Sequence, residues 1–240
     1  PELEGVPLAG ILKEAFHCEV AGDNDANAAA LAESRFGAGA GYSSVAYFTV
    51  STGIGGGFVV DGRVYRGSSG TSAEFGHQCV VPIDGPACDC GATGCLEAVA
   101  SGRGIERRAR LLAERAGPEH TRAWRLERGV ITAASVAEAA RRGDALAARL
   151  WTETAEFLGL GISNVINVLD PAIVVLGGGV AIGAADLLLE PIRETVRRRC
   201  MPSLRRATPI VAAGLGAEVG VVGAACLAME ADPGFGAVIT

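Results

Sequence analysis

The chain has 240 residues, of which 49% are apolar and 20% are charged, and its formal net charge is −6. This composition is typical of a globular protein with one large domain or two lobes, and the acidic balance argues against nucleic-acid binding within these residues. The most apolar stretch, residues 210–229, is interrupted by glycines and contains Glu218, so no membrane span is expected. There is no signal-peptide pattern, and four of the seven cysteines, Cys18, Cys79, Cys200 and Cys226, are scattered along the chain. We therefore expect a cytoplasmic protein with reduced thiols.

The first part of the chain is predicted to contain a helix followed by strands. The helix is expected over residues 26–36, where Asn24 or Asp25 can cap the first turn. Short runs of β-branched and aromatic residues, the last two joined by an Asp-Gly hairpin turn, predict the strands. These strands are expected at residues 45–50, 57–60 and 63–65.

The rest of the chain alternates long helical segments with one more strand. Residues 96–115 and 135–167 are rich in alanine and are predicted to be mostly helical, whereas residues 116–129 are expected to form an exposed loop. A short apolar strand at residues 173–176 precedes three glycines and a helix that ends near Arg199. This alternation of strands and helices predicts an α/β fold.

One histidine and three cysteines form the densest chemical signal in the chain. The cluster comprises His77, Cys88, Cys90 and Cys95. Three thiolates and one imidazole favour zinc over magnesium or calcium, and four protein ligands leave no open coordination position, so the zinc is expected to be structural. The alternative is a group of buried cysteines near a core histidine, which would not explain their tight spacing.

The same segment closely resembles the signature of the ROK family (repressors, open reading frames, kinases), which includes bacterial glucokinases and N-acetylhexosamine kinases. Residues 74–77 read Glu-Phe-Gly-His, and residues 88–97 read Cys-Asp-Cys-Gly-Ala-Thr-Gly-Cys-Leu-Glu, as in the two family motifs. The resemblance extends over residues 5–228. It implies an actin-like ATPase fold of the ribonuclease H-like type, and an ATP-dependent hexose kinase that uses Mg-ATP.

Residues 23–27, Asp-Asn-Asp-Ala-Asn, resemble the catalytic Asn-Asp-Ala-Asn element of the family. By this resemblance Asp25 is the general base that accepts the proton of the attacking sugar hydroxyl, and Asn24 contacts a sugar hydroxyl. A carboxylate at a helix start is held rigidly, and the helix dipole favours its ionised form. The alternative is that the two residues only cap the helix.

The residues Glu74, His77 and Glu97 match the remaining sugar-binding positions of the family. Carboxylates and an imidazole that converge on one ring can form paired hydrogen bonds to adjacent hydroxyls. Zinc would hold one nitrogen of His77, leave the other for a hydroxyl, and anchor the loop that carries Glu97. A salt-bridged surface role for either glutamate is the alternative.

Two glycine-rich turns are candidates for nucleotide binding. Residues 52–57 fit neither the Walker nor the dinucleotide pattern, yet a glycine hairpin can direct backbone N–H groups toward phosphate oxygens. The resemblance to ROK kinases implies that Thr52 and Gly53 contact the phosphates and that Gly177 and Gly178 lie beside the adenosine. A plain tight turn is the alternative for the second glycine run.

The resemblance also implies that part of the family fold is missing. ROK kinases begin with an Asp-x-Gly-Gly-Thr phosphate loop, and no such sequence occurs upstream of Asn24. We therefore expect a large lobe with an incomplete small lobe, and little or no turnover from these residues alone. The expected parts are a small-lobe remnant with the catalytic element (1–29), the large lobe with the zinc and sugar site (30–220), and a helix that returns to the small lobe (221–240).

Glucose is the expected substrate, with other hexoses and N-acetylhexosamines as alternatives, and the resemblance implies a homodimer or homotetramer. Two other functions stay open, namely the effector-binding portion of a ROK transcriptional regulator and a sugar-binding protein without catalysis. The retained acidic and amide site residues favour the kinase. Ser51 and Ala73 stand where the family frequently has glycine, and both are small.

Overall fold

The computed structural model describes residues 6–117, 121, 124, 130–204 and 208–231. Part of the loop expected at residues 116–129 and the end of the expected C-terminal helix lie outside these ranges. Among the described residues, no helix combines the length and apolarity needed to cross a membrane.

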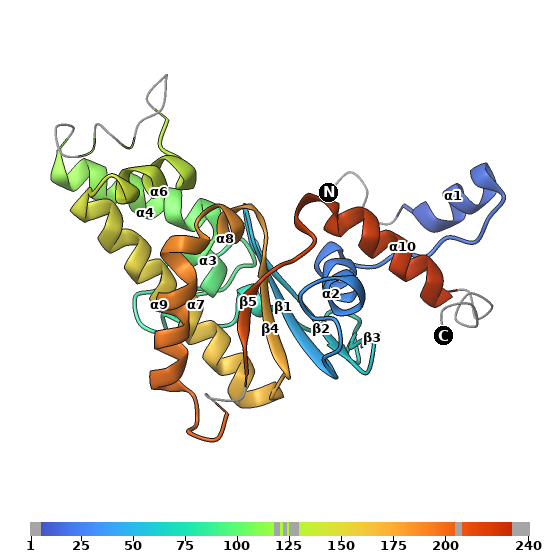
Figure 1. The fold of residues 1–240 in the computed structure, drawn as a ribbon. Helices are drawn as coiled ribbons and strands as arrows, with labels where there is room; N and C mark the ends of the chain where they lie inside the picture. Colours follow the sequence, from blue (N-terminus) through green and yellow to red (C-terminus); the bar gives the residue numbers. More distant parts are fainter. Residues whose placement is uncertain (1–5, 118–120, 122–123, 125–129, 205–207, 232–240) are drawn as a thin grey trace.

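A mixed sheet of five strands, in the order β3-β2-β1-β4-β5, forms the centre of the molecule (Figure 1). The strands β1 (Ser44–Val50), β2 (Ile54–Val60) and β3 (Arg63–Val64) form an antiparallel meander. The strands β4 (Ile173–Gly177) and β5 (Ile210–Ala212) then continue the sheet in parallel with β1. This topology confirms the predicted strands and the α/β class.

The two faces of the sheet bury different sets of strand residues, because successive side chains point to opposite faces. On β1, Ala46 and Phe48 belong to the larger core, whereas Val45 and Tyr47 belong to a smaller core on the other face. All four side chains are at most 2% exposed. Both faces of the central strand are therefore covered, which explains why β1 is apolar almost throughout.

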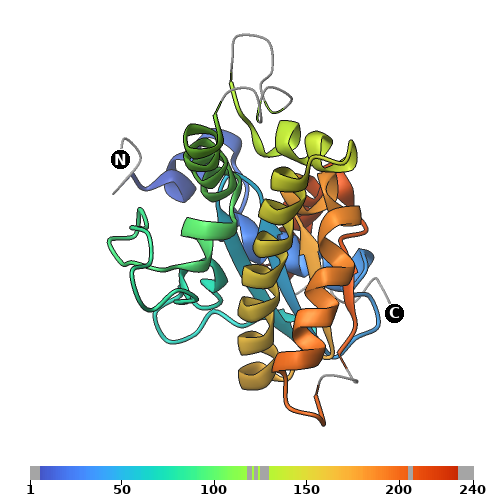
Figure 2. The same cartoon turned by 90° about the vertical axis from the view of Figure 1, so that its left-hand side faces the viewer.

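Helices cover the two faces unequally (Figure 1). The smaller core lies under α2 (Asp25–Phe36) and α10 (Val219–Ala231), which pack on each other. The larger core is covered by α3 (Leu96–Ala100), α4 (Gly102–Ala116), α6 (Ala133–Arg141), α7 (Ala145–Leu169), α8 (Gly179–Gly183) and α9 (Ala185–Arg199). Figure 2 shows α7 and α9 side by side on this face.

Two long segments expected as mostly helical are each interrupted. Ser101 is extended and caps α4 through a hydrogen bond from the Gly104 amide to its hydroxyl, so α3 ends before it. Gly143 has a φ of +89°, and Asp144 caps α7, so α6 and α7 are separate helices. Local capping chemistry thus overrides the continuous alanine-rich composition.

The glycine segment expected as a loop over residues 52–57 is instead mostly strand, because β2 begins at Ile54. Its glycines serve the packing of the neighbouring elements. A Cβ at Gly57 would come within 2.6 Å of the Ala30 Cβ and 2.7 Å of the Ala26 carbonyl oxygen, so glycine lets α2 lie directly on β2. Thr52 and Gly53 precede β2 and line cavities of the molecule.

The expected divisions at residues 29 and 220 fall within or next to continuous helices. Residue 29 lies inside α2, and α10 begins at Val219. The helix α1 (Leu8–Phe16) has no buried residue, and it extends away from the sheet (Figure 1). The described parts of residues 1–29 therefore comprise one helix that makes few contacts and one that belongs to the core.

Candidate functional site

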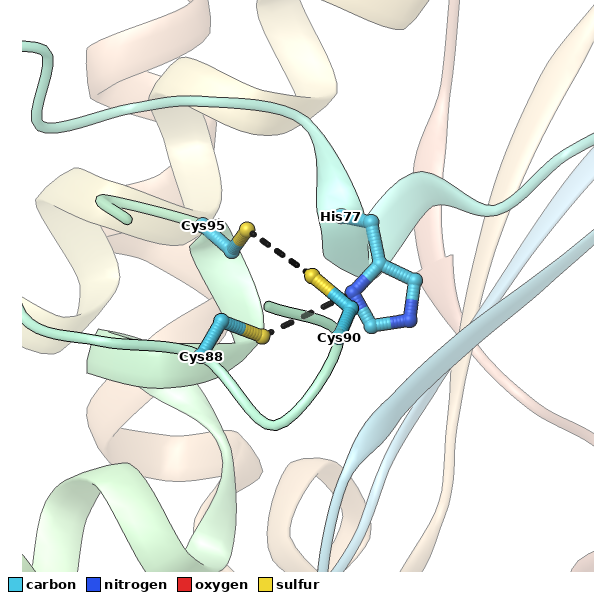
Figure 3. Close-up of side chains that lie close together, drawn as sticks. All are labelled: His77, Cys88, Cys90 and Cys95. Atoms are coloured by element: carbon cyan, nitrogen blue, oxygen red, sulfur yellow. Dashed lines mark hydrogen bonds between the residues drawn. The ribbon is translucent and has the colours of Figure 1, made fainter. Parts of the chain in front are cut away.

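The four predicted metal ligands come together at one point next to the sheet (Figure 3). His77 ends the short helix η1 (Phe75–His77), Cys88 and Cys90 lie on the following loop, and Cys95 directly precedes α3. Their ligand atoms all lie within 4.8 Å of one another. The local sequence spacing thus becomes a compact cluster of three sulfur atoms and one imidazole.

Two of the ligand-to-ligand distances in this cluster match those of a tetrahedral zinc site. The Cys88 Sγ lies 3.7 Å from the His77 Nδ1, and the Cys90 Sγ lies 3.7 Å from the Cys95 Sγ. Zinc with Zn–S bonds near 2.3 Å and Zn–N bonds near 2.0 Å separates its ligands by about 3.6–3.8 Å. Burial, followed by the neighbouring sulfur atoms, raises the pKa of the Cys95 thiol to about 12, so its thiolate requires a nearby cation at neutral pH.

The second nitrogen of His77 faces the predicted sugar ligands. The His77 Nδ1 is on the side of the sulfur atoms, whereas its Nε2 lies 3.9 Å from a carboxylate oxygen of Glu74. The Glu74 side chain is half exposed, so a ligand can reach the pair. The sequence predicts that one His77 nitrogen binds the metal and that the other bonds a sugar hydroxyl, and the positions of Nδ1 and Nε2 are consistent with this prediction.

Glu97 connects the metal cluster to the β1–β2 turn. Its Oε2 accepts a hydrogen bond of 2.8 Å from the Ile54 amide, and its Oε1 lies 3.9 Å from the Cys88 Sγ. A cavity of about 200 Å³ between these elements is lined by Thr52, Gly53, Cys88 and Glu97, among others. Glu97 is thus held by the scaffold and is not an isolated surface carboxylate.

Ala73, directly before Glu74, has a left-handed backbone conformation with a φ of +62°. This conformation is unfavourable for residues with a Cβ, which explains why a glycine suits the position. The strain lies directly before Glu74, one of the predicted sugar-site residues. The sequence showed only that an alanine stands where the family frequently has glycine.

Asp25 and Asn24 lie at the start of α2, as predicted. The Asn24 side chain accepts hydrogen bonds from the amides of Ala26 (2.8 Å) and Asn27 (3.3 Å), so it does cap the helix. Among the described residues its Nδ2 has no hydrogen-bond partner. Capping therefore uses only one end of the Asn24 amide, and the other end is available to a ligand.

Asp23 anchors the predicted catalytic element through its carboxylate. Its carboxylate receives hydrogen bonds of 2.8 Å from the Asn24 amide, the Asn27 side chain and the Arg66 guanidinium. Burial by itself raises the pKa of Asp23, but these hydrogen bonds and the Arg66 charge together hold that pKa below its ordinary value. Asp23 is therefore an ionised anchor that sequence reasoning did not identify as functional.

Asp25 lines a cavity of about 450 Å³, here called the Asp25 cavity, together with Tyr47, Gly178, Gly179 and Gly216. Of the two glycines expected beside the nucleotide, Gly178 lines this cavity, whereas Gly177 is not among the lining residues. A Cβ at Gly177 would overlap the Tyr47 hydroxyl, so this glycine is required for packing. Of the second glycine run, Gly178 and Gly179 face the cavity.

A second cavity of about 500 Å³, here called the Trp151 cavity, adjoins the first through Gly179. It also contains Thr52 of the β1–β2 turn, which connects it to the cavity beside Glu97. Its other lining residues include Arg103, Glu106, Thr132, Arg141 and Trp151. The Trp151 cavity thus shares Gly179 with the Asp25 cavity and Thr52 with the cavity beside Glu97, and the two larger cavities have volumes typical of ligand sites.

The comparisons with known proteins decide the family. The chain matches the ROK family over residues 1–231. It belongs to the ROK family. A curated glucokinase of Halalkalibacterium halodurans is 38% identical to it over 230 residues, which cover 94% of this chain and 68% of that relative.

Two solved structures show how closely the fold follows this family. The ROK glucokinase of Streptomyces griseus, solved with glucose and AMPPNP, is 40% identical and superposes with a TM-score of 0.82 over 93% of this chain and 72% of that one. A ROK transcriptional regulator, a homologue of the E. coli MLC protein, is 30% identical with a TM-score of 0.81 over 92% of this chain and 54% of that one. The expected actin-like fold is confirmed.

Residues of the ROK chain that line the Trp151 cavity were missed by sequence reasoning. Thr132, Arg141 and Trp151 are distant in sequence from the motifs, and they lie on or beside α6 and α7. No local pattern identifies them, because only the packing of these helices against the β1–β2 turn places them together.

Proposed function

We propose that this ROK protein phosphorylates a hexose, glucose first among them, by transfer from ATP, with Asp25 as the general base. The observation that carries the proposal is that Asp25 lines a cavity of about 450 Å³, which adjoins a second cavity of about 500 Å³ at Gly179, so that a nucleotide could reach Asp25. Glucokinase relatives and the glucose and AMPPNP complex of the Streptomyces griseus enzyme support ATP-dependent hexose phosphorylation as the activity.

The sugar would be held by Glu74, His77 and Glu97, with Asn24 contributing through its Nδ2. The His77 Nε2 and the Glu74 carboxylate, 3.9 Å apart, can each bond one of two adjacent hydroxyls. Glu97 uses one oxygen on the Ile54 amide and retains acceptor capacity for the sugar. Such supported groups are pre-organised, because the scaffold holds them before the sugar arrives.

The nucleotide would extend across the two larger cavities. Its nucleoside suits the Trp151 cavity, which offers both apolar and charged walls. Its phosphates suit the region of Gly179 and the Thr52–Gly53 turn, and Gly178, which the resemblance places beside the adenosine, directly precedes Gly179. A nucleotide bound in this orientation would have its terminal phosphate toward Asp25. Asp25 would take the proton of the sugar 6-hydroxyl as its oxygen attacks the γ-phosphate and ADP leaves.

Zinc is proposed as a structural ion bound by the Cys3His cluster. It would hold the η1 turn with His77 and the loop before Glu97 in one arrangement, and it would not take part in the transfer itself. Replacing Cys90 with Ser is expected to remove zinc, measured by elemental analysis, and to weaken glucose binding. Unchanged zinc content in C90S would contradict the ligand assignment.

The role of Asp25 is tested by replacement with Asn. In the protein as it is produced by its native cell, D25N should lower the rate of phosphoryl transfer by a factor of about 10²–10⁴. Glucose affinity should change by no more than a few-fold. Surviving turnover in D25N would exclude Asp25 as the base. The matched control is Asp61→Asn, which alters an exposed carboxylate in the β2–β3 turn and should leave turnover unchanged.

These 240 residues contain no Asp-x-Gly-Gly-Thr sequence, which family kinases use to hold phosphates. We therefore propose that the chain alone turns over slowly, because closure of a phosphate-binding lobe usually completes such sites. ADP formation at an ordinary kinase rate would contradict this. The intact mass of the native protein, compared with the 24.4 kDa of this chain, tells whether further residues belong to it.

A sugar-responsive regulator is the second candidate function. The likeness to the ROK transcriptional regulator, with a TM-score of 0.81, favours it. A regulator needs the sugar site but neither Asp25 nor a nucleotide cavity. Glucose binding without AMPPNP binding would therefore point to regulation or to plain sugar binding, whereas binding of both supports the kinase.

A further inference from the structure

Glu33, in the last turns of α2, is a fully buried carboxylate with 0% exposure. No cation of the described residues lies within ion-pair distance of it. Its Oε2 accepts hydrogen bonds from the Ala38 amide (2.8 Å) and the Gly214 amide (3.0 Å), and its Oε1 accepts one from the Leu215 amide (2.9 Å). Three backbone donors thus replace the water that the carboxylate loses on burial.

These bonds join two segments that are 181 residues apart. Ala38 follows α2, whereas Gly214 and Leu215 follow β5, which ends at Ala212. The two amides lie beyond the last strand pair, so the ladder of the sheet does not satisfy them. Glu33 therefore supplies the acceptors that this stretch of backbone needs at its exit from the sheet.

The surroundings of the carboxylate are shaped for it. A Cβ at Gly37 would overlap the Glu33 carboxylate, and a Cβ at Gly214 would come within 3.1 Å of the Ala38 amide nitrogen. Glycine at both positions lets the backbone approach the carboxylate closely. A leucine at position 33 would fill a similar volume but would leave three N–H groups without their carboxylate acceptor, so packing alone does not account for the glutamate.

The segment held by Glu33 leads directly into the wall of the Asp25 cavity. Gly216 and Val219, which follow Leu215, line that cavity together with Asp25. Asp25 is the first residue of α2, and Glu33 lies two turns further along the same helix. Because the helix is rigid, a bond from Glu33 to residues 214–215 sets the distance between the catalytic carboxylate and the facing wall.

Tyr47 is a third wall residue that responds to Glu33. Burial, followed by the negative charge of Glu33, raises the pKa of Tyr47 to about 12. The phenol therefore stays protonated as a hydrogen-bond donor beside the cavity across the physiological pH range. Glu33 thus lies behind the cavity and touches it only through other residues.

We infer that Glu33 is a positioning residue that fixes the width of the phosphate-binding part of the Asp25 cavity, so that its loss weakens nucleotide binding and leaves sugar binding intact. This inference rests on the proposed function for its nucleotide half. The predicted sugar-site residues Glu74, His77 and Glu97 lie on other elements, and Glu33 forms no hydrogen bond with them.

The test is Glu33→Gln, which keeps the shape of the side chain but turns one acceptor oxygen into an N–H donor that faces a backbone N–H. Hydrogen exchange in residues 213–217 should accelerate about tenfold, with no change in α7, because at least one of the three bonds is lost. Titration calorimetry should show about tenfold weaker AMPPNP binding and glucose affinity within twofold of wild type. Leu158→Ala, on the buried face of α7 in the larger core, is a control that destabilises the protein without touching the segment.

Each outcome decides the inference. A wild-type rate of hydrogen exchange at residues 213–217 in E33Q would overturn it. An equal fall in the affinities for AMPPNP and for glucose, as expected of L158A, would overturn it as well. Wild-type protein that binds glucose but no AMPPNP would contradict the proposed kinase function and the nucleotide role of Glu33. The exchange data would in that case still report whether Glu33 holds the segment.

Discussion

Replacing Gly76 with Ala tests how the sheet positions the sugar site. Gly76 lies in η1 directly before His77 and is buried against β2. A Cβ at this position would come within 3.0 Å of the Ile54 carbonyl carbon and would overlap its oxygen. The neighbour is backbone at the first residue of β2, so it cannot rotate away as a side chain could.

The magnitude follows from this overlap. Restoring an ordinary separation of about 3.5 Å from the Ile54 oxygen requires η1 to move by about 1.5 Å. Overpacking of this kind costs about 1–3 kcal/mol, which for a chain of this size lowers the melting temperature by about 2–12 °C. The same movement displaces His77, whose Nδ1 lies 3.7 Å from the Cys88 Sγ, and a metal ligand tolerates only about 0.2 Å of displacement.

Thermal unfolding, zinc content and glucose titration together measure the effect. G76A should melt lower, bind zinc about 10–100-fold more weakly and lose glucose affinity in parallel. Gly22→Ala is the matched control, because a Cβ there would meet nothing within 4 Å, and its stability should be unchanged or slightly higher. If G76A and G22A gave the same melting temperature and zinc content, the contact with Ile54 would not be what requires glycine.

Three further predictions concern backbone strain, packing and pH. Ala73→Gly should raise the free energy of unfolding by about 0.5–1 kcal/mol in urea titrations, because relief of the left-handed strain exceeds the entropy cost of glycine. Gly177→Ala should lower the free energy of unfolding by about 1–3 kcal/mol. Adding Tyr47→Phe to this variant should recover part of the loss, because it removes the overlapping hydroxyl. Equal stability of the single and the double variant would refute the contact. The folded-state pKa of Asp23 is lowered, so its stabilising effect is present above its ordinary value of 3.8 and is lost as pH falls through the lowered value. Acid titration of Asp23→Asn should therefore show a shallower loss of stability than wild type, and identical curves would contradict this.

The metal cluster and the start of α2 could be predicted from the sequence, because both depend on residues close together along the chain. Cys88, Cys90 and Cys95 lie within eight positions of one another, and few backbone paths through Gly91 and Gly94 bring three such thiols to one centre. Asn24 and Asp25 likewise need only the next turn of helix to define their geometry. Short-range constraints of this kind leave few alternatives.

Helix ends and the purpose of glycines were predicted less well, because they depend on packing partners. The run at residues 55–57 has the composition of a ligand-binding loop, yet α2 lies against Gly57 through Ala26 and Ala30. The same holds for Gly177, which a sequence pattern assigns to a ligand but which the structure pairs with Tyr47. Composition indicates that a small residue is needed there and does not indicate what approaches it.

The sequence by itself determined the α/β class, the zinc-type ligand set and the Asp25 element, since each is encoded in local spacing or in alternation along the chain. Only the tertiary structure decided that Glu33 reaches residues 214–215 and that Thr132, Arg141 and Trp151 share one cavity with Thr52. These contacts join segments that are tens to hundreds of residues apart. They form only after the helices have packed on the sheet, so no short pattern in the chain can encode them.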